Sequence, residues 1–141
     1  MKRFSGTRPN FAPATPRGSV SYGLGFLAYL PAPFFSMIVA GIVMAVVYPS
    51  QKRHGGLAAE NGRRAANWGL TIVALMVVIA GSYVWLSLAG EHDASLARAA
   101  GIPLASYIVL SIVHVVVILI GLVRANRSQV FNNPLAIGFF R

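Results

Sequence analysis

The sequence predicts an all-α integral membrane protein: a proline-broken first segment, either a re-entrant hairpin or a kinked span, and two full transmembrane helices. Only 11% of the 141 residues are charged and 56% are hydrophobic, whereas a soluble domain carries about 25% charged residues. The mean hydropathy is +0.66. The apolar residues gather into three segments of a length suited to a hydrocarbon core. A chain with so few charges to face water belongs in lipid.

Residues 1–19 form an extended, basic tail, which precedes a helical membrane domain of residues 20–141. The tail contains three prolines, two glycines and four basic residues, so it cannot bury enough apolar surface to fold alone. Phe4 and Phe11 are unusual in such a tail, and we expect them to dock onto a partner subunit or at the lipid interface. We therefore expect the tail to become ordered only on a partner or on anionic headgroups.

The first apolar segment, Tyr22 to Tyr48, is interrupted by a Pro-Ala-Pro run. Two prolines this close remove two backbone donors and disfavour helix at the residues before them. The segment is then either one kinked span or two pieces, Gly23–Leu30 and Phe34–Val47, each too short to cross alone. Two such pieces would make a re-entrant hairpin if protein covers the turn.

The rest of the chain alternates connections and spans. A loop from Pro49 to Arg64 leads to the second span, Ala65 to Leu88. A connection, Ala89 to Pro103, follows, in which Asp93 or Ser95 can cap a short helix. The third span runs from Leu104 to Val123, and an apolar C-terminal tail comes after it. Two tryptophans of the second span lie about 25 Å apart along a helix, a separation that fits interfacial aromatic residues at both membrane surfaces.

Basic residues decide between the two forms of the first segment. A hairpin would place eleven of the twelve Lys and Arg residues on one side, with the N-terminal tail, the 49–64 loop and the C-terminal tail. The positive-inside rule favours this arrangement and makes that side cytoplasmic. Because these residues flank apolar spans, anionic lipids are a sufficient partner and nucleic acid is not expected. The predicted headgroup contacts are Lys52, Arg53, Arg63, Arg64, Arg124 and Arg127.

His114 lies in the middle of the third span, where an ionisable group suggests a function. A haem ligand, a proton relay or a quinone contact is conceivable, but no second histidine lies within a span. The simpler interpretation is a neutral imidazole that is hydrogen-bonded to a neighbouring helix through Ser111 or a backbone carbonyl. No metal, cofactor or catalytic set is therefore expected, and the Glu-His-Asp run at 91–93 is interpreted as a solvated loop and helix cap.

Helix packing is expected at two places. Gly41 and Ala45 form a small-xxx-small pair, which allows two helix backbones to approach closely. Asn67 and Trp68 follow a basic turn directly at the start of the second span. They are either interfacial anchors or, for Asn67, a hydrogen-bonding contact to the first segment.

Two short motifs resemble a widespread family of small bacterial membrane proteins of unknown function, often described as similar to the channel subunit of the chloroplast inner-envelope import translocon. The first motif, before the second span, is matched by Glu60, Arg63, Ala65, Asn67 and Trp68. The second, at the C-terminus, is matched by Pro134, Leu135, Ile137 and Phe139. The chain departs from the motifs at Asn61, Gly69, Asn133 and Gly138. The resemblance implies a helical membrane fold with a broken first segment, located in the inner membrane of a bacterium, and no established activity.

The sequence therefore predicts a non-catalytic accessory subunit of a larger membrane complex, respiratory or photosynthetic, that packs against other membrane subunits. The chain is small, lacks a catalytic set and carries two ends able to lie along a partner. The alternative, a small component of membrane transport or protein translocation, follows from the resemblance alone.

Overall fold

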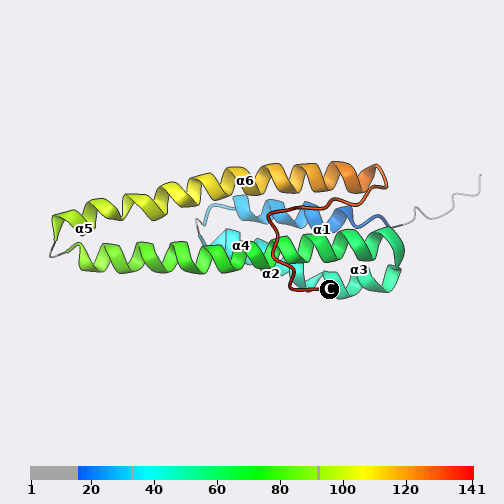
Figure 1. The fold of residues 1–141 in the computed structure, drawn as a ribbon, viewed down its shortest axis with the longest axis horizontal. Helices are drawn as coiled ribbons and strands as arrows, with labels where there is room; N and C mark the ends of the chain where they lie inside the picture. The colour runs from blue at the N-terminus through cyan, green and yellow to red at the C-terminus, as the bar shows by residue number, and fades with distance from the viewer. Residues whose placement is uncertain (1–15, 33, 92) are drawn as a thin grey trace, which may run out of the picture.

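The computed structural model describes residues 16–32, 34–91 and 93–141, and their regular structure is entirely helical. Phe4 and Phe11, with most of the predicted tail, lie outside these residues. Figure 1 shows a long helical hairpin, α4 to α6, with a shorter hairpin, α1 to α2, packed along one half of it. The all-α membrane fold that the sequence predicts is the fold observed.

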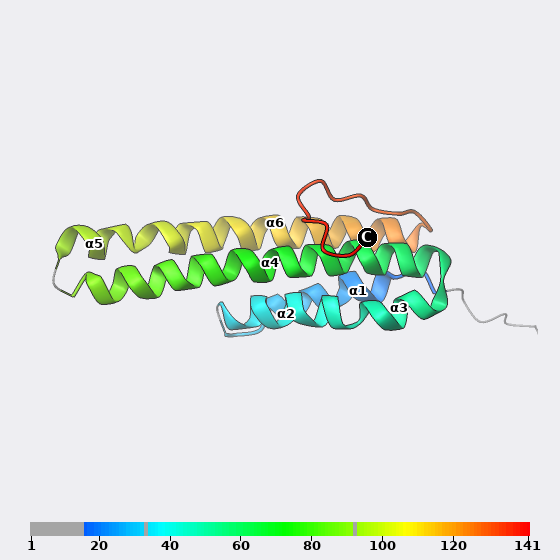
Figure 2. The same cartoon turned by 60° about the horizontal axis from the view of Figure 1, so that its bottom comes forward.

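The first apolar segment is a hairpin and not a single kinked span. It contains α1 (Ser19–Gly23), a 3-10 helix η1 (Leu24–Tyr29) and, after the turn, α2 (Phe35–Val46). α1 and η1 run toward the middle of the molecule, and α2 returns toward the end where α1 began (Figures 1 and 2). The chain therefore reverses direction between η1 and α2, with two short pieces whose bounds lie within a few residues of the predicted ones.

The turn of this hairpin is held by aromatic residues. Phe34 adopts a φ of 63°, which side-chain-bearing residues rarely do. Its ring packs against Tyr107, with centroids 4.6 Å apart, and against Tyr83 at 5.7 Å. Nearby, the Tyr29 hydroxyl donates to the carbonyl of Ser111 at 2.7 Å. Residues from both long helices therefore cover non-helical backbone that lipid could not satisfy.

The predicted 49–64 loop is wrong, because most of it is helical. α3 (Tyr48–His54) continues from α2, and α4 (Gly56–Ala89) begins about nine residues before the predicted span. The break between them is Gly55, with a φ of 67°. Ion pairs from Glu60 to arginines three and four residues later stabilise the added turns, as such spacings do on a helix face. The charged residues of this stretch predicted a solvent-facing loop, but the polar face of a helix can present the same residues.

The far end of the molecule holds the connection between the two long helices. α5 (Ala94–Ala99) is capped by Asp93, which accepts from the backbone N–H of Ser95 at 2.7 Å, and α6 (Gly101–Asn126) follows directly. This confirms Asp93 as the cap. Hydrogen bonds from the Ser95 hydroxyl and backbone hold the pKa of Asp93 below its ordinary value.

Three stretches are long and apolar enough to cross a membrane: Phe35–His54, Gly56–Ala89 and Ala94–Asn126. The chain is a multi-pass membrane protein. Among the described residues, Arg98 lies near the α5 end, while the basic residues of α3, of the start of α4 and of the C-terminal part lie toward the opposite end (Figures 1 and 2). The observed hairpin therefore produces the charge separation expected of it. Which end is cytoplasmic stays a prediction of the positive-inside rule.

The core lies where the two hairpins overlap. Gly41 of α2 and Gly69 of α4 touch backbone to backbone, since a Cβ added at Gly41 would lie 2.5 Å from the carbonyl oxygen of Gly69. Trp68 is 1% exposed in this core, so the interpretation of Trp68 as an interfacial anchor is wrong. Trp85, 63% exposed on the same helix, does face outward.

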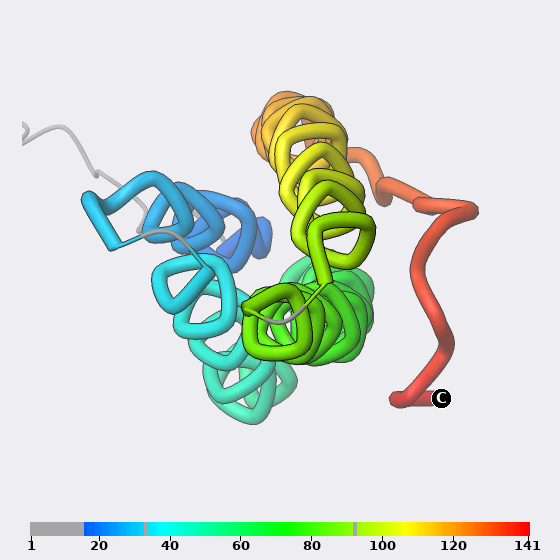
Figure 3. Tube along the Cα trace, turned by 90° about the vertical axis from the view of Figure 1, so that its left-hand side faces the viewer, coloured from blue at the N-terminus to red at the C-terminus, as the bar shows by residue number. Residues whose placement is uncertain are grey.

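Beyond the overlap, α4 and α6 pack against each other, and among the described helices only α5 also lies beside them (Figures 1 and 2). Figure 3 shows the molecule from this end, with α4 and α6 facing the viewer as a two-helix arm. The large apolar side chains of the arm are exposed: Val84, Trp85, Leu88, Ile102 and Leu104. We call these residues the apolar arm. In water such a surface would be untenable, and in a membrane it contacts lipid or other subunits.

Candidate functional site

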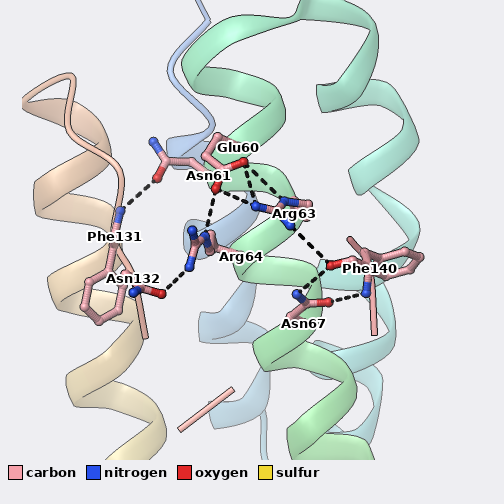
Figure 4. A network of polar contacts seen from close by, with 8 residues as sticks. All are labelled: Glu60, Asn61, Arg63, Arg64, Asn67, Phe131, Asn132 and Phe140. Carbon is pink, nitrogen blue, oxygen red and sulfur yellow. Dashed lines mark hydrogen bonds and ion pairs between the residues drawn. The ribbon is translucent and has the colours of Figure 1, made fainter. Parts of the chain in front are cut away.

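The two motifs that carry the family resemblance are about 70 residues apart in sequence and meet in the fold. The residues after α6, 128–141, turn back from its end and cross the first half of α4 without forming a helix (Figure 1). We call residues 128–141 the C-terminal segment. Figure 4 shows its side chains and carbonyls meeting the polar residues of α4. The candidate site is the polar cluster between these two stretches.

Three polar side chains of α4 hold the backbone of the C-terminal segment. Asn61, fully buried, accepts from the N–H of Phe131 and donates to the carbonyls of Gln129 and Arg17. Asn67 accepts from the N–H of Phe140 at 2.8 Å and donates to the same residue's carbonyl at 3.2 Å. These asparagine amides replace backbone partners that an irregular segment lacks.

Thr71 completes this set one turn deeper. Its Oγ1 accepts from the N–H of Ile137 at 2.8 Å and donates to the carbonyl of Asn67 at 2.8 Å. Together the three side chains satisfy amides of the segment at three points, so α4 positions it along much of its length. Asn67 thus contacts the C-terminal segment, and the predicted contact to the first segment is wrong.

The charged part of the cluster centres on Glu60. Its carboxylate accepts from Arg63 Nη2 at 2.7 Å and from Arg64 Nε at 2.9 Å (Figure 4). Arg63 also reaches the carbonyl of Phe140, and Arg64 Nη1 donates to the Asn132 side chain. One carboxylate therefore serves two guanidinium groups, which leaves an excess of positive charge.

A pocket of about 450 Å³ opens beside this cluster. Its wall combines basic side chains, amide side chains and backbone of the C-terminal segment: Arg63, Arg64, Asn67, Asn132, Asn133, Ala136, Gly138, Phe140 and Arg141. Cationic and amide N–H groups on one concave surface suit an anionic group with several acceptor oxygens.

His114 lies in the core, away from this pocket, and is fully buried. The indole N–H of Trp68 donates to its Nδ1 at 3.1 Å, and its Nε2 lies 3.0 Å from the carbonyl oxygen of Gly25. Because Nδ1 accepts, Nε2 carries the proton and donates to Gly25. The imidazole thus joins α4, α6 and the 3-10 helix η1, with a backbone carbonyl as one of its two partners.

The other predicted residues lie apart from the pocket. Gly41 makes a close helix contact, but its partner is Gly69, and Ala45 is partly exposed. Lys52 and Arg53 are exposed on α3, and Arg127 is exposed after α6. The guanidinium of Arg124 lies 5.6 Å from the ring centre of Phe131, a cation–π distance. Of the six predicted headgroup contacts, the pocket therefore includes only Arg63 and Arg64.

Sequence reasoning missed Asn61, Thr71 and the C-terminal asparagines. The available signal was polar residues at positions 61, 67 and 71, which lie on neighbouring turns of one helix near or within an apolar run. Such a row needs hydrogen-bonding partners, although their location could not be read from it. Within the described ranges, no three His, Cys, Asp or Glu side chains gather as a metal cluster.

Comparison with known proteins gives one family. The model of the magnetosome magnetite crystal formation protein family matches residues 21–140. The search of curated proteins and the search of solved structures each gave no match. The matched stretch includes both halves of the candidate site. The match agrees with the predicted resemblance to a family of small membrane proteins, while the likeness to the translocon channel subunit stays a prediction.

Proposed function

We propose that this chain, which belongs to the magnetosome magnetite crystal formation protein family, serves crystal formation as a non-catalytic structural subunit of the magnetosome membrane. The family's involvement in magnetite formation and the multi-pass membrane fold are the premises. The structural role, the partners and the location in that membrane are the proposal. The family replaces a respiratory or photosynthetic complex as the expected setting.

The observation that carries the proposal is the hydrogen bonding of His114. It is the one Asp, Glu, Lys, Arg or His residue within the three apolar segments. Both of its ring nitrogens are engaged by Trp68 and Gly25, inside the core. A side chain used in this way on both sides joins helices and has no free atom for proton transfer or ligation. These contacts of His114 favour a structural role for the described membrane helices.

The apolar arm supports a role among neighbouring subunits. Its exposed side chains come from α4 and α6, and in the described part of the chain the short hairpin does not extend beside them (Figures 1 and 2). Helices in membranes associate by close packing, and a two-helix arm presents several faces for it. The arm would hold the chain in a larger assembly around the growing crystal, while the polar cluster lies at the other end.

The test is purification from magnetosome membranes in mild detergent. We expect wild-type protein to co-migrate with membrane partners at fixed stoichiometry, and to conduct no ions when reconstituted alone in liposomes. Tryptophan substitutions along the arm, at Val84, Leu88 or Ile102, should lower the recovery of partners without preventing insertion. The same substitution at Ile42, exposed on α2 and outside the arm, is the matched control. Ion flux through the purified chain would instead establish the transport alternative.

A further inference from the structure

We propose that the pocket between α4 and the C-terminal segment binds a phosphate group, carried by an anionic lipid headgroup or present as free inorganic phosphate. The inference does not depend on the proposed structural role. It rests on the charge at the pocket, on one buried donor without an acceptor, and on the position of the pocket along α4.

The charge at the pocket favours an anion. Arg63 and Arg64 share a single carboxylate, that of Glu60, so one positive charge stays uncompensated before Arg141 is counted. In the described part of the chain, Arg64 uses Nε for Glu60 and Nη1 for Asn132. Its Nη2 keeps two N–H groups for another acceptor. Planar guanidinium groups bind phosphate oxygens through such paired N–H groups.

Asn133 supplies the second and independent observation. It lines the pocket and is only 7% exposed. Its Oδ1 accepts from the backbone N–H of Leu135 at 3.1 Å, which fixes the orientation of the amide. Its Nδ2 is buried and has no hydrogen-bond partner among the described residues. A buried donor without an acceptor is costly, and an acceptor oxygen of a ligand in the pocket would remove that cost.

The position of the pocket explains why two sources of phosphate must be compared. Arg63, Arg64 and Asn67 lie where the charged start of α4 passes into its apolar run. Lipid phosphates occupy this level of a bilayer, and basic pockets beside helices bind anionic headgroups there. The pocket is also accessible from the aqueous side, because Asn132 and Arg141 on its wall are exposed.

The experiment uses the full chain in micelles of a maltoside detergent, which carries neither phosphate nor charge. One series adds phosphatidylglycerol to the micelles, and the other adds inorganic phosphate. The midpoint of thermal unfolding is measured in both, because a ligand that binds only the folded protein raises it. A rise with phosphatidylglycerol alone identifies the headgroup as the source, and a rise with inorganic phosphate identifies the free ion.

Asn133→Asp is the decisive variant. It keeps the oxygen that Leu135 uses, replaces the free donor by an acceptor and adds a negative charge. We expect it to weaken binding by about tenfold or more. Asn126→Asp is the matched control, since it makes the same charge change at an exposed residue that ends α6 and lies outside the pocket wall. It should leave the rise of the midpoint unchanged.

A second pair keeps the proposal testable if Asn133→Asp folds poorly. Arg64→Gln should reduce binding by a similar factor, whereas Arg53→Gln, on the exposed face of α3, should not. Equal effects within each pair would reveal general surface electrostatics and overturn the proposal. No rise of the midpoint with either source of phosphate would overturn it as well.

Discussion

Hydrogen bonding by His114 links three elements that are far apart in sequence. The residue accepts from Trp68 and donates to Gly25, which fixes one neutral tautomer. A protonated imidazole would direct its Nδ1–H at the indole N–H, so two donors would face each other in an apolar core. The neutral state expected from the sequence thus has a specific structural reason here, which is the location of the Trp68 N–H.

We predict that replacing His114 by Leu destabilises the protein, whereas replacing it by Gln changes little. Leu fills similar space but leaves the Trp68 N–H and the Gly25 carbonyl without partners. It should lower the free energy of unfolding by about 1–3 kcal/mol. Gln keeps a donor and an acceptor, so it should insert, assemble and support crystal formation nearly as wild type. Thermal unfolding in detergent and crystal size in complemented cells measure this. Loss of crystals with Gln, at normal protein level, would make His114 more than structural.

Features of single residues could be predicted from the sequence when they depend only on neighbouring residues in the chain. Asp93 as a helix cap was predictable, because a cap depends on its next few residues. The burial of Trp68 could not be predicted. A tryptophan at the start of a span can be either interfacial or buried, and the sequence around it is the same in both cases. Trp68 is buried here because α6 places Nδ1 of His114 as an acceptor where the indole N–H points.

At the scale of elements, the pairing of α2 and α4 depends on a glycine contact from both sides. A Cβ at Gly69 would meet the carbonyl oxygen of Gly41 and lie 2.9 Å from the Cβ of Met44. Backbone atoms cannot move aside as the end of a flexible side chain can. The small-xxx-small pattern at Gly41 and Ala45 pointed to α2 as a packing helix, but the partner glycine lies on another element and no spacing identifies it.

We predict that Gly69→Ala and Gly81→Ala change stability in opposite directions. At Gly69 the new methyl group forces the two helices apart, and overpacking of this kind costs about 1–3 kcal/mol. Gly81 lies on the same helix, is exposed and has no other atom near the added Cβ. Alanine there should stabilise by about 0.5–1 kcal/mol. Denaturation in mixed micelles measures both, and a stabilising Gly69→Ala would contradict the close packing described here.

The C-terminal segment is the element that depends most on side chains of another. We predict that Asn67→Ala frees its last residues, because the N–H of Phe140 loses its partner and the carbonyl of Phe140 keeps only the longer contact from Arg63, at 3.5 Å. Hydrogen exchange at the amide of Phe140 should accelerate by tenfold or more, while the amide of Phe131, held by Asn61, should change little.

Asn132→Ala is the control for that measurement, since the Asn132 side chain contacts Arg64 and holds no backbone amide of the segment in the described structure. Unchanged exchange at Phe140 in Asn67→Ala would show that the segment stays in place without this asparagine. The sequence indicated an apolar segment at the C-terminus and a packing role for Asn67. It could not join them, because contacts between residues about 70 positions apart leave no local periodicity.

At the scale of the whole molecule, the hairpin determines where the charges go. The reversal at the Pro-Ala-Pro run returns the chain to the end from which it started, so the α3–α4 junction and the C-terminal segment share that end (Figures 1 and 2). The pocket and its arginines lie there, and the apolar arm and α5 point the other way. The two proposals depend on this polarity, because headgroup-level chemistry and subunit packing are assigned to opposite ends.

Cysteine accessibility in isolated magnetosome vesicles tests this arrangement most directly, because the chain has no cysteine of its own. Single cysteines would be placed at Ser50 of α3, Ser128 after α6 and Ser95 of α5, all of which are exposed. In intact vesicles that are sealed with the cytoplasmic face outward, positions 50 and 128 should react with an impermeant maleimide. Position 95 should react only after detergent is added. Reaction at 95 together with 50 in intact vesicles, or protection of 50 while 128 reacts, would contradict the hairpin topology.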